Sequence, residues 1–331
     1  MPGNSPRLIW RNRNTRVKTF LKIIVVLVVV AVLGLVIAGR PDESIEISEL
    51  RDARKGLTVV TLSDGVTRYQ LEGPESGPLI LLIHGGREPG WTWDEVVPVL
   101  HQAGIRTLRY DMYGRGFSDR PQDTAYDQAF YLKQAEDLLD ALQISSHLHV
   151  AGYSFGSNIA AKLAIARPQQ VESLTELAPR YFGIALPAVV RVPLLNSVII
   201  RKMLKPKVLD DVRGYFQTPQ LKQKYAGRVG EPTGVIGNFV SFKAFALSDA
   251  LVGTADIYED LNKTGVPVLI VSGGKDLDIP KEHIAGIVSL VPDAKQVVYP
   301  EANHGLVWQN GTEIALEMAE FVGAGVPISE L

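Results

Sequence analysis

Strand-like and helix-like patterns of apolar residues alternate along the chain from residue 57 onward. Short apolar or β-branched runs, typical of strands, occur at 106–110, 148–152, 174–178, 266–272 and 295–299. Longer stretches with helical spacing occur at 93–103, 128–142, 156–166, 281–290 and 312–322. Strands that alternate with helices form parallel βαβ crossovers, which place helices on both faces of a sheet. The pattern therefore predicts an α/β fold with a mostly parallel central sheet.

Three further stretches refine this prediction. Residues 58–62 and 67–71 are alternating or β-branched runs on either side of a Ser-Asp-Gly turn, which predicts an antiparallel hairpin. Residues 79–83 are apolar without interruption, as is typical of a central strand covered on both faces. From about 181 to 253 the alternation gives way to prolines, aromatic residues and helix-like apolar spacing. We interpret this insertion as a helical cap over the α/β core.

The N-terminal segment has a different pattern, in which basic residues from Arg7 to Lys22 precede an uncharged apolar run from Ile23 to Ala38. At about 1.5 Å per residue this run forms a helix of roughly 24 Å, and residues 19–22 bring it near the hydrocarbon thickness of roughly 30 Å. Lys22 can extend its amine to the membrane interface. The pattern favours a single-pass membrane protein with a cytoplasmic N-terminus and an extracytoplasmic domain. A signal peptide cleaved after Ala38 is the alternative.

These patterns predict the following domain organisation. Residues 1–22 form a basic cytoplasmic tail, and residues 23–39 form a transmembrane signal-anchor or, in the alternative, a signal peptide. Residues 40–56 are rich in charge and are interpreted as a stalk. Residues 57–331 form the folded domain, with the cap at about 181–253.

Charge and composition exclude several classes of function. The formal net charge is -2, so the chain lacks the global basic field of a nucleic-acid-binding protein, and we expect no nucleic-acid partner. The absence of cysteine excludes disulfides, thiolate nucleophiles and cysteine-based zinc sites. Catalytic chemistry in this chain must therefore come from other side chains.

The clearest candidate nucleophile is Ser154, within Gly152-Tyr153-Ser154-Phe155-Gly156. The pentapeptide lies between the strand pattern at 148–152 and the helix pattern that follows it. In this context a G-x-S-x-G sequence forms a sharp turn that holds the serine in a strained backbone conformation. Glycines at the outer positions avoid the clashes that side chains would make there. The sequence predicts a nucleophile elbow, and an ordinary glycine-containing loop is the alternative.

A serine hydroxyl needs a neighbouring base, which a third group orients. Asp276 is the first carboxylate after the strand pattern at 266–272, at the edge where the carboxyl ends of parallel strands meet. We assign it as the orienting acid and keep Asp278 as the alternative, although Asp278 could instead cap the helix that follows. His304 follows the last strand pattern at the same edge, and we assign it as the general base.

A serine mechanism also requires N–H donors for the oxyanion that develops on the substrate. His84-Gly85-Gly86 directly follows the apolar run at 79–83. We predict the backbone N–H groups of Gly86 and Phe155 as the two donors of the oxyanion hole. A tight turn that merely requires glycine is compatible with the same residues. We expect His84 to order this loop by hydrogen bonds rather than to take part in the chemistry.

From about residue 58 to the C-terminus the chain resembles the α/β hydrolase superfamily, in its group of capped serine esterases, lipase-like enzymes and C-C hydrolases. The sequences HGG, YDMYGRGFSDRP, GYSFG, GGKDLDIP and ANHG stand in the order and approximate spacing of that superfamily. The order Ser154, Asp276, His304 is also the one found there. The resemblance implies an α/β hydrolase fold and a serine mechanism. A serine at the elbow argues against haloalkane dehalogenases and epoxide hydrolases, which use aspartate at this position.

We therefore predict hydrolysis of carboxylic esters, with lipid-like acyl esters as a candidate subclass, through an acyl-enzyme intermediate and without a metal or organic cofactor. The expected partners are a small-molecule or lipid-like ester and, through the N-terminal helix, a membrane. A C-C bond hydrolase of the meta-cleavage type is one alternative, because HGG followed by Pro89-Gly90 resembles enzymes of aromatic catabolism. In that case Arg87 could bind a substrate carboxylate, although an exposed arginine at the rim is the simpler explanation. A non-catalytic binding protein on the same fold is the other alternative.

The apolar residues at 181–204 of the predicted cap have two interpretations. They could pack the cap onto the core, or some of them could line an acyl pocket. In the second case, cations of the cap would face anionic lipid headgroups. These cations are Arg191, Arg201, Lys202, Lys205 and Lys207.

Overall fold

The computed structural model describes residues 6–324, and within them the strands form one eight-stranded sheet. The strands are β1 (Thr58–Leu62), β2 (Gly65–Glu72), β3 (Leu79–Ile83), β4 (Arg106–Tyr110), β5 (Leu148–Tyr153), β6 (Val171–Leu177), β7 (Val268–Gly273) and β8 (Lys295–Tyr299). Their order across the sheet is β1-β2-β4-β3-β5-β6-β7-β8. β2 pairs antiparallel with β1 and with β4, and every other pair is parallel. The predicted mostly parallel sheet and its antiparallel hairpin are confirmed.

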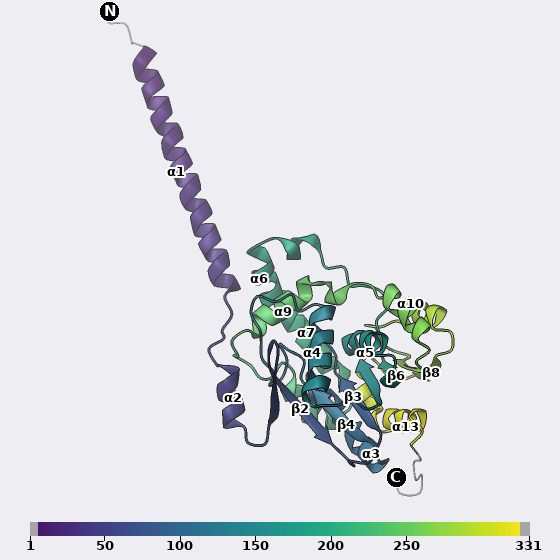
Figure 1. The fold of residues 1–331 in the computed structure, drawn as a ribbon. Coiled ribbons are helices and arrows are strands. Elements are labelled where there is room, and N and C mark those ends of the chain that lie inside the picture. Colours follow the sequence, from purple (N-terminus) through teal and green to yellow (C-terminus); the bar gives the residue numbers. More distant parts are fainter. Residues whose placement is uncertain (1–5, 325–331) are drawn as a thin grey trace, which may run out of the picture. The chain divides into compact units, whose positions relative to one another are not determined.

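Helices cover both faces of this sheet (Figure 1). The α-helices are α1 (Pro6–Gly39), α2 (Ile47–Ala53), α3 (Val97–Gln102), α4 (Gln128–Ala141), α5 (Phe155–Ala166), α6 (Leu195–Ile199), α7 (Lys205–Tyr215), α8 (Pro219–Tyr225), α9 (Asn238–Leu247), α10 (Ala255–Thr264), α11 (Lys281–Leu290), α12 (Leu306–Gln309) and α13 (Gly311–Phe321). Short 3-10 or π segments are η1 (Gly90–Trp93), η2 (Ala188–Arg191), η3 (Ile200–Leu204), η4 (Ala226–Arg228) and η5 (Asp249–Leu251). Helix α5 packs against both α4 and α10 on one face, whereas α3 packs against α13 on the other.

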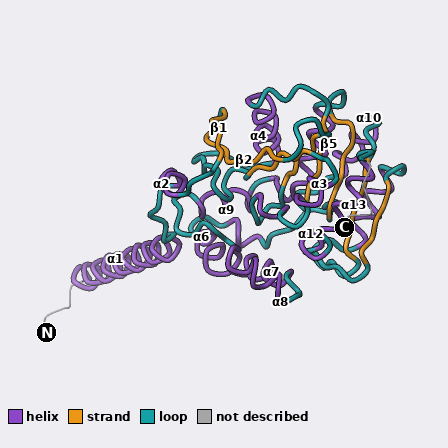
Figure 2. Tube along the Cα trace, turned by 90° about the horizontal axis from the view of Figure 1, so that it is seen from below, coloured by secondary structure: helices purple, strands orange, loops and turns teal. Residues whose placement is uncertain are grey.

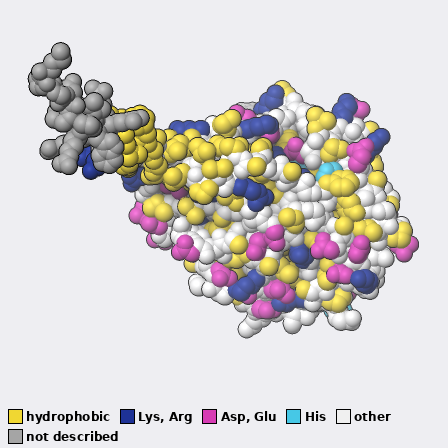
Figure 3. Space-filling model, turned by 90° about the horizontal axis from the view of Figure 1, so that it is seen from above, with side chains coloured by type: hydrophobic (Ala, Val, Ile, Leu, Met, Phe, Trp, Pro, Cys, Tyr) yellow, Lys and Arg dark blue, Asp and Glu magenta, His cyan; other side chains and the backbone are white. Residues whose placement is uncertain are grey.

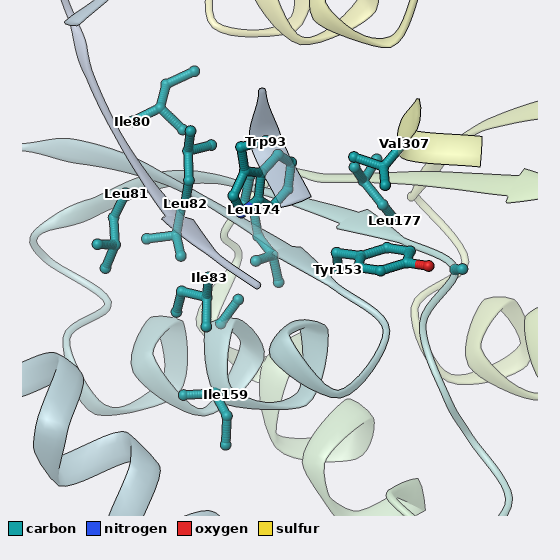
Figure 4. Close-up of a cluster of buried hydrophobic side chains, with 14 of the residues drawn as sticks. Ile80, Leu81, Leu82, Ile83, Trp93, Tyr153, Ile159, Leu174, Leu177 and Val307 are labelled. Carbon is teal, nitrogen blue, oxygen red and sulfur yellow. The ribbon is translucent and has the colours of Figure 1, made fainter. Parts of the chain in front are cut away.

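The core lies between the sheet and these helix layers. Figure 4 shows Ile80 to Ile83 of β3 in one cluster with Ile159 of α5, Leu174 of β6 and Trp93 of η1. The four β3 side chains are at most 1% exposed, which explains why the strand is apolar at every position. β5 is likewise buried along its whole length, so it carries the turn at its end on a rigid support.

One predicted helix differs from the structure. The pattern at 93–103 predicts a continuous helix, but the chain forms η1 and then begins α3 only at Val97. The reason is Pro98, which has no N–H to donate to the carbonyl four residues earlier and is therefore tolerated only in the first turn of a helix.

The insertion between β6 and β7 is helical, as predicted. Residues 178–267 are all described, and they form helices, loops and one isolated bridge at Val235 (Figure 2). The helical elements of the predicted cap are η2, α6, η3, α7, α8, η4, α9 and η5.

The described chain divides into two units. One unit combines the residues up to Pro41 with Leu186–Leu204, and the other combines Asp42–Ala185 with the residues from Lys205 onward. In the first unit the end of α1 packs on α6, where a Cβ added to Gly39 would lie 2.9 Å from the Cβ of Ser197. The Arg201 guanidinium donates to the Ala38 carbonyl at 3.1 Å. Residues from the first part of the predicted cap thus form one unit with the N-terminal helix.

Helix α1 has the composition of a membrane span. Its segment Val17–Gly39 has a mean hydropathy of 3.2 and is long and apolar enough to cross a membrane, as a signal sequence also can be. Apolar side chains cover the described part of α1 in Figure 3. The segment is therefore consistent with either an anchor or a signal peptide.

The residues interpreted as a stalk are bonded within the second unit. The Glu43 carboxylate accepts hydrogen bonds from the backbone N–H groups of Gly237 and Phe239, at 3.0 and 2.6 Å. Arg51 of α2 forms an ion pair with Asp119 at 2.7 Å. This segment is thus attached to the folded unit at both of these points.

Candidate active site

The turn between β5 and α5 has the geometry of a nucleophile elbow. Ser154 has φ 53° and ψ -118°, a strained conformation for a residue with a side chain. A Cβ added to Gly152 would lie less than 3.0 Å from the Gly156 carbonyl, and one added to Gly156 would lie less than 3.0 Å from the Ile83 carbonyl. The glycines are therefore required by close backbone contacts, as the sequence predicts.

The structure brings Ser154, His304 and Asp276 together in one chain of hydrogen bonds. His304 Nε2 lies 3.0 Å from Ser154 Oγ, and His304 Nδ1 lies 2.8 Å from Asp276 Oδ2. The three residues are 4–9% exposed, although they are far apart in the sequence. With the Nδ1 proton donated to Asp276, the lone pair of Nε2 faces the serine hydroxyl. This is the arrangement in which an imidazole can accept a proton from serine.

Asp276 is fixed by its own loop. Its Oδ1 accepts hydrogen bonds from the N–H groups of Asp278 and Ile279, at 2.9 and 2.8 Å, so that Oδ2 is left for His304. The carboxylate thereby has a defined orientation before any substrate binds. This geometry favours Asp276 over Asp278 as the orienting acid.

Asp278 has different partners. Its carboxylate accepts a hydrogen bond from Arg87 at 3.1 Å and a short one from the Tyr215 hydroxyl, which also accepts from Arg87. Burial alone would raise the pKa of Asp278, but His304 and Arg87 lower it, and the net shift is downward. Asp278 is therefore an ionised partner of Arg87, and Arg87 is paired and partly buried rather than an exposed rim residue.

Tyr215 was not anticipated from the sequence. It lies at the end of α7, and its ring centroid is 5.3 Å from that of His304. Together with Arg87 and Asp278 it connects the cap helix, the loop after β3 and the loop after β7. No motif surrounds it, because its role depends on contacts with residues far away in the chain.

The two predicted oxyanion donors lie close to each other. A Cβ added to Gly86 would lie 3.4 Å from the Cβ of Phe155 and 2.8 Å from the ring of Phe245. Within the described part of the chain, neither the Gly86 N–H nor the Phe155 N–H has a hydrogen-bond acceptor. Phe155 is the first residue of α5, where a helix leaves its N–H groups unpaired. Both groups are thus available to a ligand, and their role as oxyanion donors stays a prediction.

His84 holds the loop that contains Gly86. Its Nε2 accepts a hydrogen bond from the Met112 N–H at 2.8 Å, so Nδ1 carries the proton and donates to the Gly85 carbonyl at 2.7 Å. Burial lowers the pKa of His84 to about 4, so the ring is neutral at neutral pH. His84 therefore has the ordering role expected from the sequence.

Among the described residues, no group of three or more His, Asp or Glu side chains is arranged to hold a metal ion.

Comparisons with known proteins agree with the fold. The sequence model of the Alpha/beta hydrolase family matches residues 80–317. A 2-hydroxymuconate semialdehyde hydrolase of Pseudomonas sp. (strain CF600) is 37% identical over 111 residues, which cover 32% of this chain and 38% of that protein. The enzyme of the same name from Pseudomonas putida is 26% identical over 206 residues, which cover 60% of this chain and 70% of that protein. The first of these matches spans less than two thirds of the relative's length.

A solved structure resembles nearly the whole chain. It is that of a membrane phospholipase A, described as a novel bacterial virulence factor, with 20% sequence identity and a TM-score of 0.60. The likeness covers 92% of this chain, a share that cannot be reached without part of α1, and 98% of the other. Since the family match extends over more than half of the sequence, this protein belongs to the alpha/beta hydrolase family.

Proposed function

We propose that this protein is a membrane-tethered serine hydrolase that cleaves carboxylic esters through an acyl-enzyme intermediate. The observation that carries the proposal is the hydrogen-bonded chain Asp276–His304–Ser154, which ends at a serine in a strained turn. A buried serine that is hydrogen-bonded to an oriented imidazole is the arrangement required for nucleophilic catalysis.

Each group has a defined role in this mechanism. Ser154 Oγ attacks the ester carbonyl carbon and transfers its proton to His304 Nε2, while Asp276 stabilises the imidazolium. The N–H groups of Gly86 and Phe155 stabilise the oxyanion of the tetrahedral intermediate. His304 then gives the proton to the leaving alkoxide, and the acyl group remains on Ser154. In the second half, His304 takes a proton from water, the hydroxide attacks the acyl carbon, and Ser154 is released with its proton restored.

Lipid-like acyl esters are the substrate class that we favour. Helix α1 supports a membrane location, and a membrane phospholipase A shares the fold over most of this chain. We retain the predicted single-pass orientation, with the N-terminus cytoplasmic and the catalytic domain extracytoplasmic. We also retain the predicted boundaries of tail, anchor, connecting segment and capped domain as part of the proposal. The bonds of Glu43 and Arg51 attach the connecting segment, residues 40–56, to the folded unit.

Hydrolysis of a carbon-carbon bond is the second candidate function. Two relatives carry the name 2-hydroxymuconate semialdehyde hydrolase. This favours carbon-carbon bond hydrolysis over the activities of other relatives as the second candidate. It would use the same serine, acid and base. The two candidates differ in the bond that is cleaved, so a substrate comparison separates them.

The experiment is a panel of p-nitrophenyl esters of graded acyl length, assayed beside 2-hydroxymuconate semialdehyde, with Ser154→Ala as the matched variant. We expect turnover of the esters, loss of that turnover in Ser154→Ala, and labelling of the wild-type serine by a fluorophosphonate probe. Turnover of the semialdehyde alone would transfer the assignment to the second candidate. A folded protein that neither hydrolyses esters nor reacts with the probe would leave only a non-catalytic binding role.

A further inference from the structure

A small cavity next to the oxyanion loop carries an unusual number of cations. Its volume is about 50 Å³, and its lining includes Arg87, Arg115, Arg120 and Lys205 but only one carboxylate, that of Glu231. All of these residues belong to the unit that contains the candidate active site. We call this space the cationic cavity.

Arg115 has hydrogen-bonding capacity that the described protein does not use. Its Nε donates to the Gly86 carbonyl at 2.7 Å and its Nη1 to the Gly114 carbonyl at 3.1 Å, both of which are neutral acceptors. Its Nη2 is buried and has no partner among the described residues, and the whole residue is 8% exposed. A buried donor without an acceptor is costly, so this group calls for a ligand atom that accepts a hydrogen bond.

Arg120 is a second buried guanidinium without a bonded carboxylate. It is 6% exposed and donates to Asn238 Oδ1, the Ser118 carbonyl and the Gly116 carbonyl, at 2.6, 2.5 and 2.8 Å. Burial, and then the neighbouring Arg115, lower its pKa to about 10, so it stays protonated at neutral pH. Buried charges are stabilised when an opposite charge accompanies them.

The acidic groups around the cavity offset only part of this charge. Asp278 is engaged by Arg87, and Glu43 faces Lys205 while it accepts two backbone hydrogen bonds. Burial lowers the pKa of Lys205, Glu43 opposes that shift, and Arg115 and Arg120 lower the pKa further. Glu88, buried beside Arg87 and Arg115, has its pKa raised by burial to about 7 and is only partly ionised at neutral pH. Asp111 and Asp119 also raise the pKa of Arg120, but they form ion pairs with Arg68 and Arg51. Arg115 and Arg120 donate only to neutral acceptors, so neither guanidinium has a hydrogen-bonded carboxylate, and a ligand anion could supply one.

The cationic cavity is joined to the predicted oxyanion hole. Arg87 follows Gly86 in the chain, and Arg115 is hydrogen-bonded to the Gly86 carbonyl. The Phe245 ring lies 5.0 Å from the Phe155 ring and 5.2 Å from the Arg115 guanidinium. A ligand in the cavity would consequently sit against the same loop that supplies one donor to the ester carbonyl.

We propose that the cationic cavity binds the anionic group, a phosphate or a carboxylate, of an ester whose carbonyl lies at Ser154. This inference rests on the proposed function and deepens it by naming the substrate class. Planar guanidinium groups match both phosphate and carboxylate oxygens, and a mobile lysine amine adds a further donor. Apolar side chains such as Val208 and Phe242 also line the cavity, which suits an amphiphilic ester with one charged end.

The test compares matched neutral and anionic substrates on the full chain in detergent at constant ionic strength. One pair is octanoylglycerol and octanoylglycerol phosphate, and the other is methyl octanoate and the monomethyl ester of octanedioic acid. The variant is Lys205→Gln, and the control is Lys207→Gln on the same helix, because Lys207 is exposed and pairs with Asp211 outside the cavity lining. Inhibition of p-nitrophenyl butyrate hydrolysis by inorganic phosphate, with chloride as the reference salt, is measured in parallel.

We expect a higher kcat/KM for the anionic member of at least one pair, and a loss of about tenfold in the anionic-to-neutral ratio for Lys205→Gln but not for Lys207→Gln. Preference for the phosphate ester without inhibition by inorganic phosphate identifies a lipid-borne phosphate, whereas inhibition identifies a site that also takes the free anion. Equal kcat/KM within both pairs, or equal ratios in the two variants, overturns the proposal while ester hydrolysis stands. If no ester is hydrolysed, the proposed function fails, and titration calorimetry with inorganic phosphate then decides whether the cavity binds anions.

Discussion

Replacement of Asp276 by asparagine tests the orientation of the candidate catalytic base. Asp276 Oδ1 accepts two backbone N–H bonds, so the carbonyl oxygen of an asparagine would take that position and its amide nitrogen would face His304 Nδ1. Because an amide nitrogen only donates, Nδ1 would have to accept, and the imidazole proton would move to Nε2. His304 would then point a donor at the Ser154 hydroxyl and could not remove its proton.

The expected loss in kcat is about 10⁴-fold, the size seen when a triad histidine is held in the wrong tautomer. At about 1.4 kcal/mol per decade this is roughly 5.5 kcal/mol of transition-state stabilisation. The assay is p-nitrophenyl ester turnover combined with the rate of fluorophosphonate labelling, and a thermal melt of each variant shows that the protein is folded.

Asp278→Asn is the matched control, because it lies in the same loop and has its bonds to Arg87 and Tyr215 instead of to the imidazole. We expect a reduction of less than about tenfold, since the change weakens a partly exposed ion pair and leaves the His304 tautomer unchanged. A larger loss in Asp278→Asn than in Asp276→Asn would refute the reasoning and transfer the orienting role to Asp278.

Other predictions concern packing, pH and topology. Gly156→Ala should lower the free energy of unfolding by more than about 3 kcal/mol, because the added Cβ would press on the Ile83 carbonyl. Gly214→Ala is the control: its added Cβ would meet no atom within 4 Å, so the change should be neutral or stabilising in the same denaturant titration. Burial raises the pKa of Glu176 from 4.5 to about 8, so its contribution to stability is present below pH 4.5 and is lost as the pH rises to 8. Glu176→Gln should therefore melt higher than the wild type at pH 8 but not at pH 4, and equal differences at both values would contradict this. Protease added outside intact cells should digest the catalytic domain, and protection until the membrane is broken would reverse the proposed orientation.

Local patterns were sufficient to predict most of the sheet. The apolar run of β3 and the alternation of strands with helices follow from burial and periodicity, which neighbouring residues determine. The candidate site could be located for a related reason. Ser154, Asp276 and His304 each follow a strand pattern, and parallel strands bring their carboxyl ends to one edge. The structure adds the hydrogen-bond distances between Asp276 and His304 and between His304 and Ser154.

Contacts between distant segments could not be predicted in this way. Arg87, Tyr215 and Asp278 are far apart in the sequence and have no shared motif, so their network becomes visible only when the cap helix is placed. The bonds from Glu43 to the turn before α9 likewise depend on tertiary packing. The charged run at 40–56 predicts a stalk, but the sequence does not reveal which residues of the folded unit it contacts.

The packing of α6 on the end of α1 affects the solubility expected of an enzyme that lacks α1. A protein that begins after Pro41 would retain the whole unit that carries Ser154, Asp276 and His304. It would also lack the C-terminal end of α1, on which Ser197 packs and to which Arg201 donates a hydrogen bond. The apolar side chains that η2 and η3 already expose would then lie beside a newly uncovered α6. Poor solubility of such a fragment would reflect a missing neighbour rather than a damaged catalytic unit, and redesign of residues 186–204 is the remedy that the fold suggests.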